Sequence, residues 1–248
     1  MQITIVGNGK MALSLKDGLK NTHEVTIIAR DTSRTPDVNT IALENNTDIT
    51  DQIVLFCVKP HVLKPVSAKL TGKAKAVISI LAGTTLHSLQ ENLQAQAYVR
   101  AMPNLAATYG ESITSLTGDE SFSEEAKEIF NSIGKSVWLS SEKELDIATA
   151  IGGSGPAFLA LVAEALSDGG VNSGLKRDDA NQIVKGLFNS FNALIQEQHP
   201  ALLKDAVMSP GGTTSAGVTS LEASGVRDAF IKAISDANTR AKELAKQN

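Results

Sequence analysis

The chain has 248 residues, of which 42% are hydrophobic, so it is long enough for one large domain or two modest domains with an ample core. Its net charge of −4 provides no basic footprint for nucleic acid, and its single cysteine, Cys57, excludes an intramolecular disulfide framework. His, Cys and carboxylate residues nowhere have the spacing of metal ligands, and no apolar run is expected to reach the length of a membrane span. Because the first residues indicate a strand and not a signal peptide, we expect a cytoplasmic protein with neither nucleic acid nor membrane as a partner.

A dinucleotide-binding fingerprint stands at the N-terminus. Residues 3–6 are mostly β-branched and apolar, which predicts a short buried strand, and the leucines after residue 12 indicate a helix. Between them lies G-x-G-x-x-A, in the strand–turn–helix context that this fingerprint requires. Gly7 is expected to make the tight turn, Gly9 to let a pyrophosphate reach the helix N-terminus, and Ala12 to allow close packing. The sequence therefore predicts a Rossmann-type nucleotide site.

The second predicted strand, Glu24–Ala29, ends where the adenosine ribose of such a site would lie. NAD-selective sites place Asp or Glu at this strand tip, whereas this chain has Ala29 and Arg30, followed by Asp31-Thr32-Ser33-Arg34. Two arginines and two hydroxyls suit a 2′-phosphate, although Asp31 could pair with an arginine instead. This loop favours NADPH and leaves NADH open.

Further strands are predicted at residues 53–58, 76–80, 97–101 and 137–139, and they alternate with helices. Such alternation is typical of a mostly parallel, doubly wound sheet, in which ligands bind at the carboxyl ends of the strands. Lys59, the turn at residues 81–83 and Asn104 are therefore expected along the cofactor groove. As loop residues, each could instead simply cap a strand end.

The second half of the chain indicates helices almost throughout. Ser141 and Glu144 have capping-box spacing, and a later helix is predicted over residues 226–246. An apolar stripe predicts another helix, which Pro200 should end; the stripe consists of Ile183, Leu187, Phe191 and Leu194. We place the boundary near residues 139–141, which gives domains 1–140 and 141–248. The surplus apolar stripes of the helical half predict at least a homodimer.

Two glycine-rich segments interrupt these helices. Residues 152–158 contain three glycines and a proline, which predicts a kink with small side chains toward the cofactor, or simply close helix packing. Ser209–Thr214, with the sequence SPGGTT, predicts a loop that opens a helix. Free backbone N–H groups at such a helix start suit a small anion such as a carboxylate, but the segment could also be a plain helix cap.

Five motifs together resemble the pyrroline-5-carboxylate reductase family over nearly the whole chain. They are GNGKMA at 7–12, VKPH at 58–61, RAMPN at 100–104, GSGPAF at 153–158, and VMSPGGTTSAG at 207–217 with Leu221-Glu222 after it. The last of these is long and specific. Phe158 stands where the family usually has Tyr, Ala12 where it often has Gly, and Gly153 where Ser is common.

The resemblance implies an α/β fold, with an N-terminal Rossmann-like doubly wound sheet, an all-α C-terminal dimerisation domain, and substrate bound where two subunits meet. It implies reduction of 1-pyrroline-5-carboxylate to L-proline by hydride transfer from NAD(P)H, the final step of proline biosynthesis. Thr214 would be catalytic, because its hydroxyl would contact the ring nitrogen. The substrate-binding residues would be Gly211, Gly212, Thr213, Thr214, Glu197 and Glu142. The cofactor-binding residues would be Gly7, Asn8, Gly9, Lys10, Met11, Ala29, Arg30, Ser33, Val58, Lys59, Pro60, Ala82, Gly83 and Asn104.

Two other functions are compatible with a dinucleotide-binding fingerprint. A hydroxyacid dehydrogenase of similar architecture would need a Lys or His base close to an Asn in the helical half, and Lys176, Lys185 and His199 stand in no such pattern. A non-catalytic dinucleotide sensor would keep the N-terminal fingerprint but would have no need of a glycine-rich anion loop in the second half.

Overall fold

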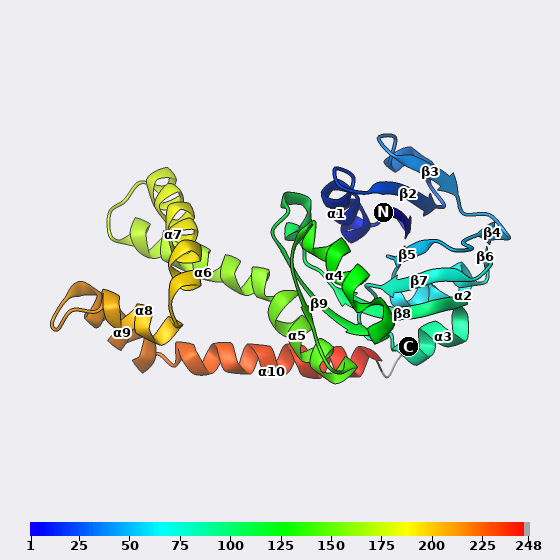
Figure 1. Cartoon of the computed structure of the whole chain (residues 1–248). Coiled ribbons are helices and arrows are strands. Elements are labelled where there is room, and N and C mark those ends of the chain that lie inside the picture. The colour runs from blue at the N-terminus through cyan, green and yellow to red at the C-terminus, as the bar shows by residue number, and fades with distance from the viewer. Residues whose placement is uncertain (246–248) are drawn as a thin grey trace. The chain divides into compact units, whose positions relative to one another are not determined.

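The computed structural model describes residues 1–245, drawn in Figure 1. The chain forms two compact units: Met1–Gly153 together with the segment that begins at Asp236, and Ser154–Ser235. The first unit thus contains helix α5 (Glu142–Gly152), which follows the predicted boundary at residues 140 and 141 and packs on strand β9 (Ser112–Gly118).

The first unit is built on an eight-stranded sheet with the order β10-β9-β8-β7-β5-β1-β2-β3. The other seven strands of this sheet are β1 (Gln2–Val6), β2 (Glu24–Ala29), β3 (Asn39–Ala42), β5 (Ile53–Phe56), β7 (Ala74–Ser79), β8 (Ala95–Met102) and β10 (Gly134–Trp138). Only the β8–β9 pairing is antiparallel, while β4 (Thr47–Asp48) and β6 (Leu70–Thr71) form a separate small parallel pair. The predicted mostly parallel sheet is confirmed.

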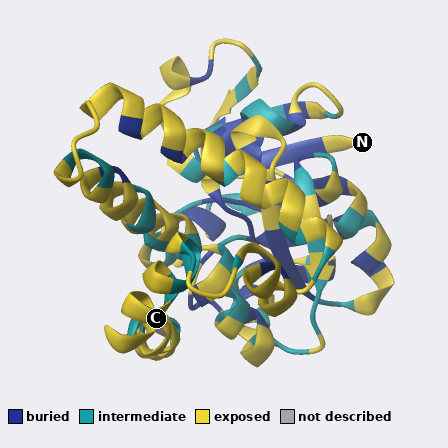
Figure 2. Ribbon diagram, turned by 90° about the vertical axis from the view of Figure 1, so that its left-hand side faces the viewer, coloured by how far each residue is buried: buried dark blue, intermediate teal, exposed yellow. Residues whose placement is uncertain are grey.

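Helices cover both faces of this sheet, as a doubly wound fold requires. Alternate residues of each strand point to opposite faces, so Leu55 belongs to one hydrophobic cluster and Phe56 to the other. The first cluster includes residues of α1 (Lys10–Leu19) and α4 (Ser123–Asn131), and the second includes residues of α2 (Leu63–Ser67) and α3 (Leu86–Asn92). Figure 2 shows the buried residues concentrated in the strands.

Two strands of the sheet were not predicted. β3 is a four-residue edge strand with mostly exposed side chains, so it lacks the apolar run of its neighbours. β9 has the sequence SITSLTG, in which hydroxyl residues dominate. Thr114 is nevertheless fully buried, and its hydroxyl lies 3.2 Å from that of Ser112. Such mutual pairing lets a polar strand occupy an interior position.

The second unit is entirely helical among the residues described. It contains α6 (Gly155–Asn172), α7 (Arg177–Glu197), α8 (Pro200–Val207), α9 (Thr213–Ala223) and the first part of α10 (Val226–Ala245). The predicted end of helix α7 before Pro200 is confirmed. Helix α7 ends at Glu197, but Pro200 then occupies the first turn of α8, where its missing N–H costs nothing. The predicted end of the last helix, Lys246, lies outside the described residues.

Apolar side chains stay exposed along this second unit. Leu161 is 66% exposed, Leu159 52% and Ile183 59%. The helical stretch Glu142–Asn172 is also long and apolar enough to cross a membrane, judged by length and composition only, which corrects our expectation that no run reaches that length. The stretch is interrupted by a turn at Gly153–Ser154, as the glycine-rich sequence predicted. Its exposed leucines leave an apolar surface on the single chain.

Candidate active site

The predicted nucleotide loop has the geometry that a pyrophosphate needs. Gly7 has a φ of +116°, and a Cβ there would lie 2.6 Å from the Cys57 carbonyl oxygen, so only glycine fits. Gly9 is the N-cap of α1 and uses no side chain to cap the helix. Apart from Gly9 and its two chain neighbours, no described residue has an atom within 4 Å of the position a Cβ of Gly9 would take. Open space therefore faces the free N–H groups of α1, at Lys10 and Met11, and an anion fits there.

The loop after β2 leaves two guanidinium groups free. Asp31 caps a short 3-10 turn at Thr32–Arg34: its Oδ1 accepts hydrogen bonds from the Ser33 amide at 3.0 Å and the Ser33 hydroxyl at 2.6 Å. These bonds hold the pKa of Asp31 below its ordinary value. Among the described residues Asp31 makes no hydrogen bond or ion pair with Arg30 or Arg34, and the charge of Arg34 adds less than the Ser33 bonds to the lowering of its pKa. Because the Ser33 hydroxyl donates to Asp31, it is less available to a phosphate than the exposed guanidinium groups of Arg30 and Arg34.

Two further predicted segments lie at the carboxyl ends of strands beside β1. Val58–Pro60 follow β5, and Lys59 is exposed. Ala82 and Gly83 follow β7, and Gly83 has a φ of +72°. Since β1, β5 and β7 are adjacent and parallel, these turns share one edge of the sheet with the glycine loop.

Asn104, after β8, is buried and makes its hydrogen bonds inside the protein. Its Oδ1 accepts from the Ala106 amide at 3.0 Å, and its Nδ2 donates to the Gly152 carbonyl at 3.1 Å. The side chain thus caps one turn and fixes the last residue of α5. Its predicted contact with a nicotinamide has to compete with these two bonds.

Arg100 is the largest fully buried side chain described, and sequence reasoning assigned it no role of its own. Its Nη1 donates to Glu142 at 2.9 Å and its Nη2 to Asp146 at 3.0 Å, both on α5. Glu142 also accepts from the Leu86 amide at 2.9 Å. Glu142, predicted to support substrate, therefore anchors α5 to the sheet. An arginine within a mostly apolar strand is the sequence signal of such an anchor, because a buried charge needs partners.

The second glycine-rich loop joins α8 to α9. Gly211 has a φ of +71°, which favours glycine, and the Gly212 amide donates to the Ser209 carbonyl at 3.0 Å. Gly212 is the N-cap of α9 and no side chain caps that helix start. The plain-cap interpretation has no capping side chain to support it, whereas free N–H groups at Thr213 and the half-buried Thr214 suit a carboxylate.

The two predicted acidic residues of the substrate site belong to different compact units. Glu197 is the last residue of α7 and is exposed, and α8 separates it along the chain from the loop before α9. Glu142 belongs to the other compact unit.

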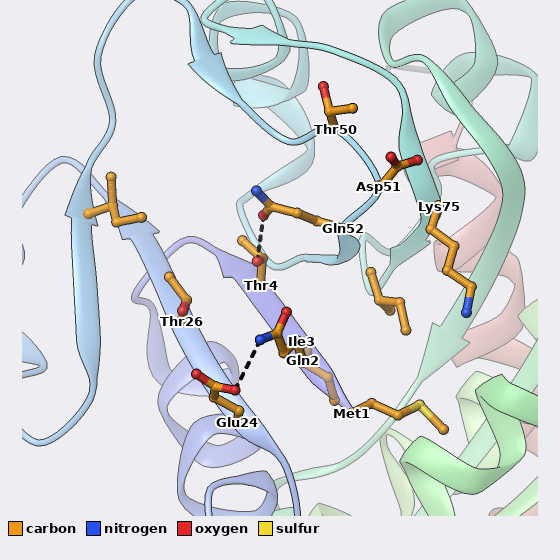
Figure 3. Close-up of a pocket in the computed structure, with 12 residues that line it drawn as sticks. Met1, Gln2, Ile3, Thr4, Glu24, Thr26, Thr50, Asp51, Gln52 and Lys75 are labelled. Atoms are coloured by element: carbon orange, nitrogen blue, oxygen red, sulfur yellow. Dashed lines mark hydrogen bonds between the residues drawn. The ribbon is translucent and has the colours of Figure 1, made fainter.

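A separate pocket of about 620 Å³ lies at the amino ends of the parallel strands (Figure 3). Its walls include Thr4, whose hydroxyl donates to Gln52 at 2.6 Å, and Gln2, whose amide donates to Glu24 at 3.1 Å. This edge is opposite to the one that carries the glycine loop, so the pocket is distinct from the predicted cofactor site.

Comparison with known proteins assigns both halves of the chain. Residues 142–244 match the family model described as pyrroline-5-carboxylate reductase dimerisation, and residues 2–83 match NADP oxidoreductase, coenzyme F420-dependent. Pyrroline-5-carboxylate reductase of Synechocystis is 43% identical over 79% of this chain and 76% of that protein. The enzyme of Pisum sativum is 37% identical over 97% and 94% of the two chains.

Solved structures agree over the full length. The crystal structure of 1-pyrroline-5-carboxylate reductase from Streptococcus pyogenes has a TM-score of 0.84 at 31% identity and covers 98% of both chains. Pyrroline carboxylate reductase of Plasmodium falciparum, with NADP bound, has a TM-score of 0.83 at 26% identity and covers 99% of this chain and 100% of that one. With relatives at 31–43% identity matching most of its length, the chain belongs to the pyrroline-5-carboxylate reductase family.

Proposed function

We propose that the chain reduces 1-pyrroline-5-carboxylate to L-proline with a hydride from NADPH, as the final step of proline biosynthesis. The observation that carries this proposal is the similarity to named pyrroline-5-carboxylate reductases over nearly the whole length, one of them with NADP bound. NADH remains possible as a second donor. A cytoplasmic location and a functional division into residues 1–140 and 141–248 belong to the same proposal.

The residues of the chain have a defined part in this reaction. The cofactor supplies the hydride, and the protein positions and stabilises the reactants. The free N–H groups at Thr213 and Thr214 hold the substrate carboxylate, because a helix N-terminus attracts an anion. The Thr214 hydroxyl contacts the ring nitrogen, which changes from imine to amine. A protonated imine accepts hydride readily, so the site needs no strong acid.

One assay separates this function from its rivals. NADPH oxidation by the full chain should require 1-pyrroline-5-carboxylate and should yield proline. Turnover of 2-keto acids in its place would instead point to a hydroxyacid dehydrogenase. Cofactor binding without turnover of either substrate would point to a dinucleotide sensor.

Substitution of Arg30 by glutamate should discriminate between the two cofactors. Arg30 is exposed at the tip of β2 and has no described ion-pair partner, so its guanidinium suits the 2′-phosphate. Glu would place a like charge there and should weaken NADPH far more than NADH. Dissociation constants for both cofactors check this expectation. An equal effect on the two would show that Arg30 does not contact the 2′-phosphate.

Sedimentation should give a molar mass of at least twice the 26.1 kDa of one chain. Leucines along α6 are about half exposed or more in the single chain, and the dimerisation family matches the residues that carry them. Burying such a surface against a second copy removes apolar area from water, which favours a homodimer. Sedimentation velocity at assay concentration measures the assembly. A fully active monomer would contradict a site shared between subunits.

A further inference from the structure

We propose that Asp37, held by Lys16 of α1 and by Lys20 directly after this helix, is a positioning residue that sets the preference for a 2′-phosphorylated cofactor. The inference rests on the proposed function, since it concerns the choice between NADPH and NADH. Asp37 itself contacts no cofactor in this proposal. It acts through the loop that carries Arg30 and Arg34.

The first anchor of this loop is the ion-pair cluster between Asp37 and α1. Lys16 Nζ lies 2.8 Å from both carboxylate oxygens of Asp37, and Lys20 Nζ lies 2.9 Å from Oδ2. The Lys16 side chain is only 8% exposed, so its ammonium depends on nearby carboxylates. Lys16, and after it Lys20, holds the pKa of Asp37 well below its usual range. Asp37 therefore stays charged and paired at neutral pH.

The second anchor lies at the other end of the loop. Asn8 Nδ2 donates to the Asp31 carbonyl at 2.6 Å, and the Asp31 side chain holds the following turn through Ser33. Asn8 belongs to the glycine fingerprint, and Lys16 belongs to the helix that this fingerprint opens. Both ends of the segment 31–37 are thus tied to the element that receives the pyrophosphate.

These two anchors fix where the arginines stand relative to the pyrophosphate site. A 2′-phosphate and the pyrophosphate belong to one ligand, so their protein partners must keep a set separation. A loop already ordered in that geometry binds the extra phosphate without paying to order itself on binding. NADH has no 2′-phosphate, so its binding should not depend on the position of Arg30 and Arg34.

The variant Asp37→Asn tests this role sharply, because charge and position predict opposite results. Removing a negative charge near the loop would by itself favour a 2′-phosphate. Loss of the anchor at Asp37 would instead free the loop and weaken binding of the 2′-phosphate. The isosteric Asn keeps the side-chain volume, and Lys16 keeps a second carboxylate, Asp17, at 3.0 Å, so the fold should survive.

We expect Asp37→Asn to lower the ratio of kcat/KM for NADPH to that for NADH by roughly tenfold, the scale of one lost preorganised contact. The dissociation constant for NADPH should rise in parallel, and that for NADH should stay within about twofold. The matched control is Glu124→Gln, which removes the acceptor of a 2.8 Å lysine pair on α4. That control should leave both cofactors unchanged.

Other outcomes overturn the inference. An equal loss of affinity for NADPH and NADH would mean that Asp37 only supports the fold. Tighter binding of NADPH would mean that Asp37 acts only through its negative charge and not by positioning the loop. An unchanged ratio would mean that the loop needs no anchor at Asp37. Failure of the proposed function is distinguishable, because cofactor titrations report on Asp37 even if the chain does not reduce 1-pyrroline-5-carboxylate.

Discussion

Thr214→Ala is expected to lower kcat for reduction of 1-pyrroline-5-carboxylate by roughly 10- to 150-fold and to raise KM much less. A lost hydrogen bond to a charged group is worth about 1.5–3 kcal/mol, which gives that range of rates. Thr214 is half-buried in the first turn of α9, the helix start that has no side-chain cap. Its hydroxyl would meet a nitrogen whose charge and bonding change during hydride transfer, so the contact should matter most in the transition state.

Steady-state kinetics with saturating NADPH measure this effect, and two variants control it. Thr214→Ser keeps the hydroxyl and should retain most of the activity. Thr213→Ala alters the exposed neighbouring residue and should change kcat much less. Wild-type kcat in Thr214→Ala would indicate that the loop at residues 209–212 serves only to begin a helix.

Arg100→Met should lower the free energy of unfolding by about 3 kcal/mol, near the lower end of the range for a broken buried ion pair. The substitution keeps an apolar chain in the core but leaves Glu142 and Asp146 without their cation. Because these two carboxylates are 33% and 23% exposed, water partly compensates them, which places the effect at the lower end.

Urea unfolding at a fixed protein concentration measures the change for Arg100→Met. Lys127→Met is the control, since it removes a half-buried lysine from a 2.8 Å pair with the exposed Glu124 on α4. That control should cost less than about 1 kcal/mol. A loss of similar size in both variants would contradict a special role for the buried guanidinium.

Much of the nucleotide-binding half could be predicted because its signals are local. A parallel strand buried on both faces is a short apolar run, and Ile53–Phe56 shows this directly. The fingerprint at residues 7–12 places the tight turn at Gly7, the uncrowded position at Gly9 and the start of α1 within six consecutive residues. Strands β3 and β9 lack the apolar pattern because one is an exposed edge and the other buries hydroxyls.

The roles of Asn104, Glu142 and Ser33 could not be predicted in the same way. Each has a side chain that suits a ligand, but the fold supplies a protein partner first. The partners of Asn104 and Glu142 lie far along the chain, at Gly152 and Arg100, so no local sequence pattern predicts these contacts. Ser33 and Asp31 are near neighbours, yet an arginine partner for Asp31 was equally compatible with the sequence. Polar residues at strand ends therefore need a three-dimensional contact to decide between anchor and ligand.

The hydrogen bonds that hold α5 to the rest of the first unit determine where a nucleotide-binding fragment can be cut. A chain ended after residue 140 would lose both carboxylates that neutralise Arg100 and the acceptor of the Leu86 amide. It would also lose the carbonyl that receives the Asn104 side chain. A chain ended at Gly153 would keep all four bonds. The shortest N-terminal fragment that keeps these four bonds therefore ends with α5 and not with the last strand of the sheet.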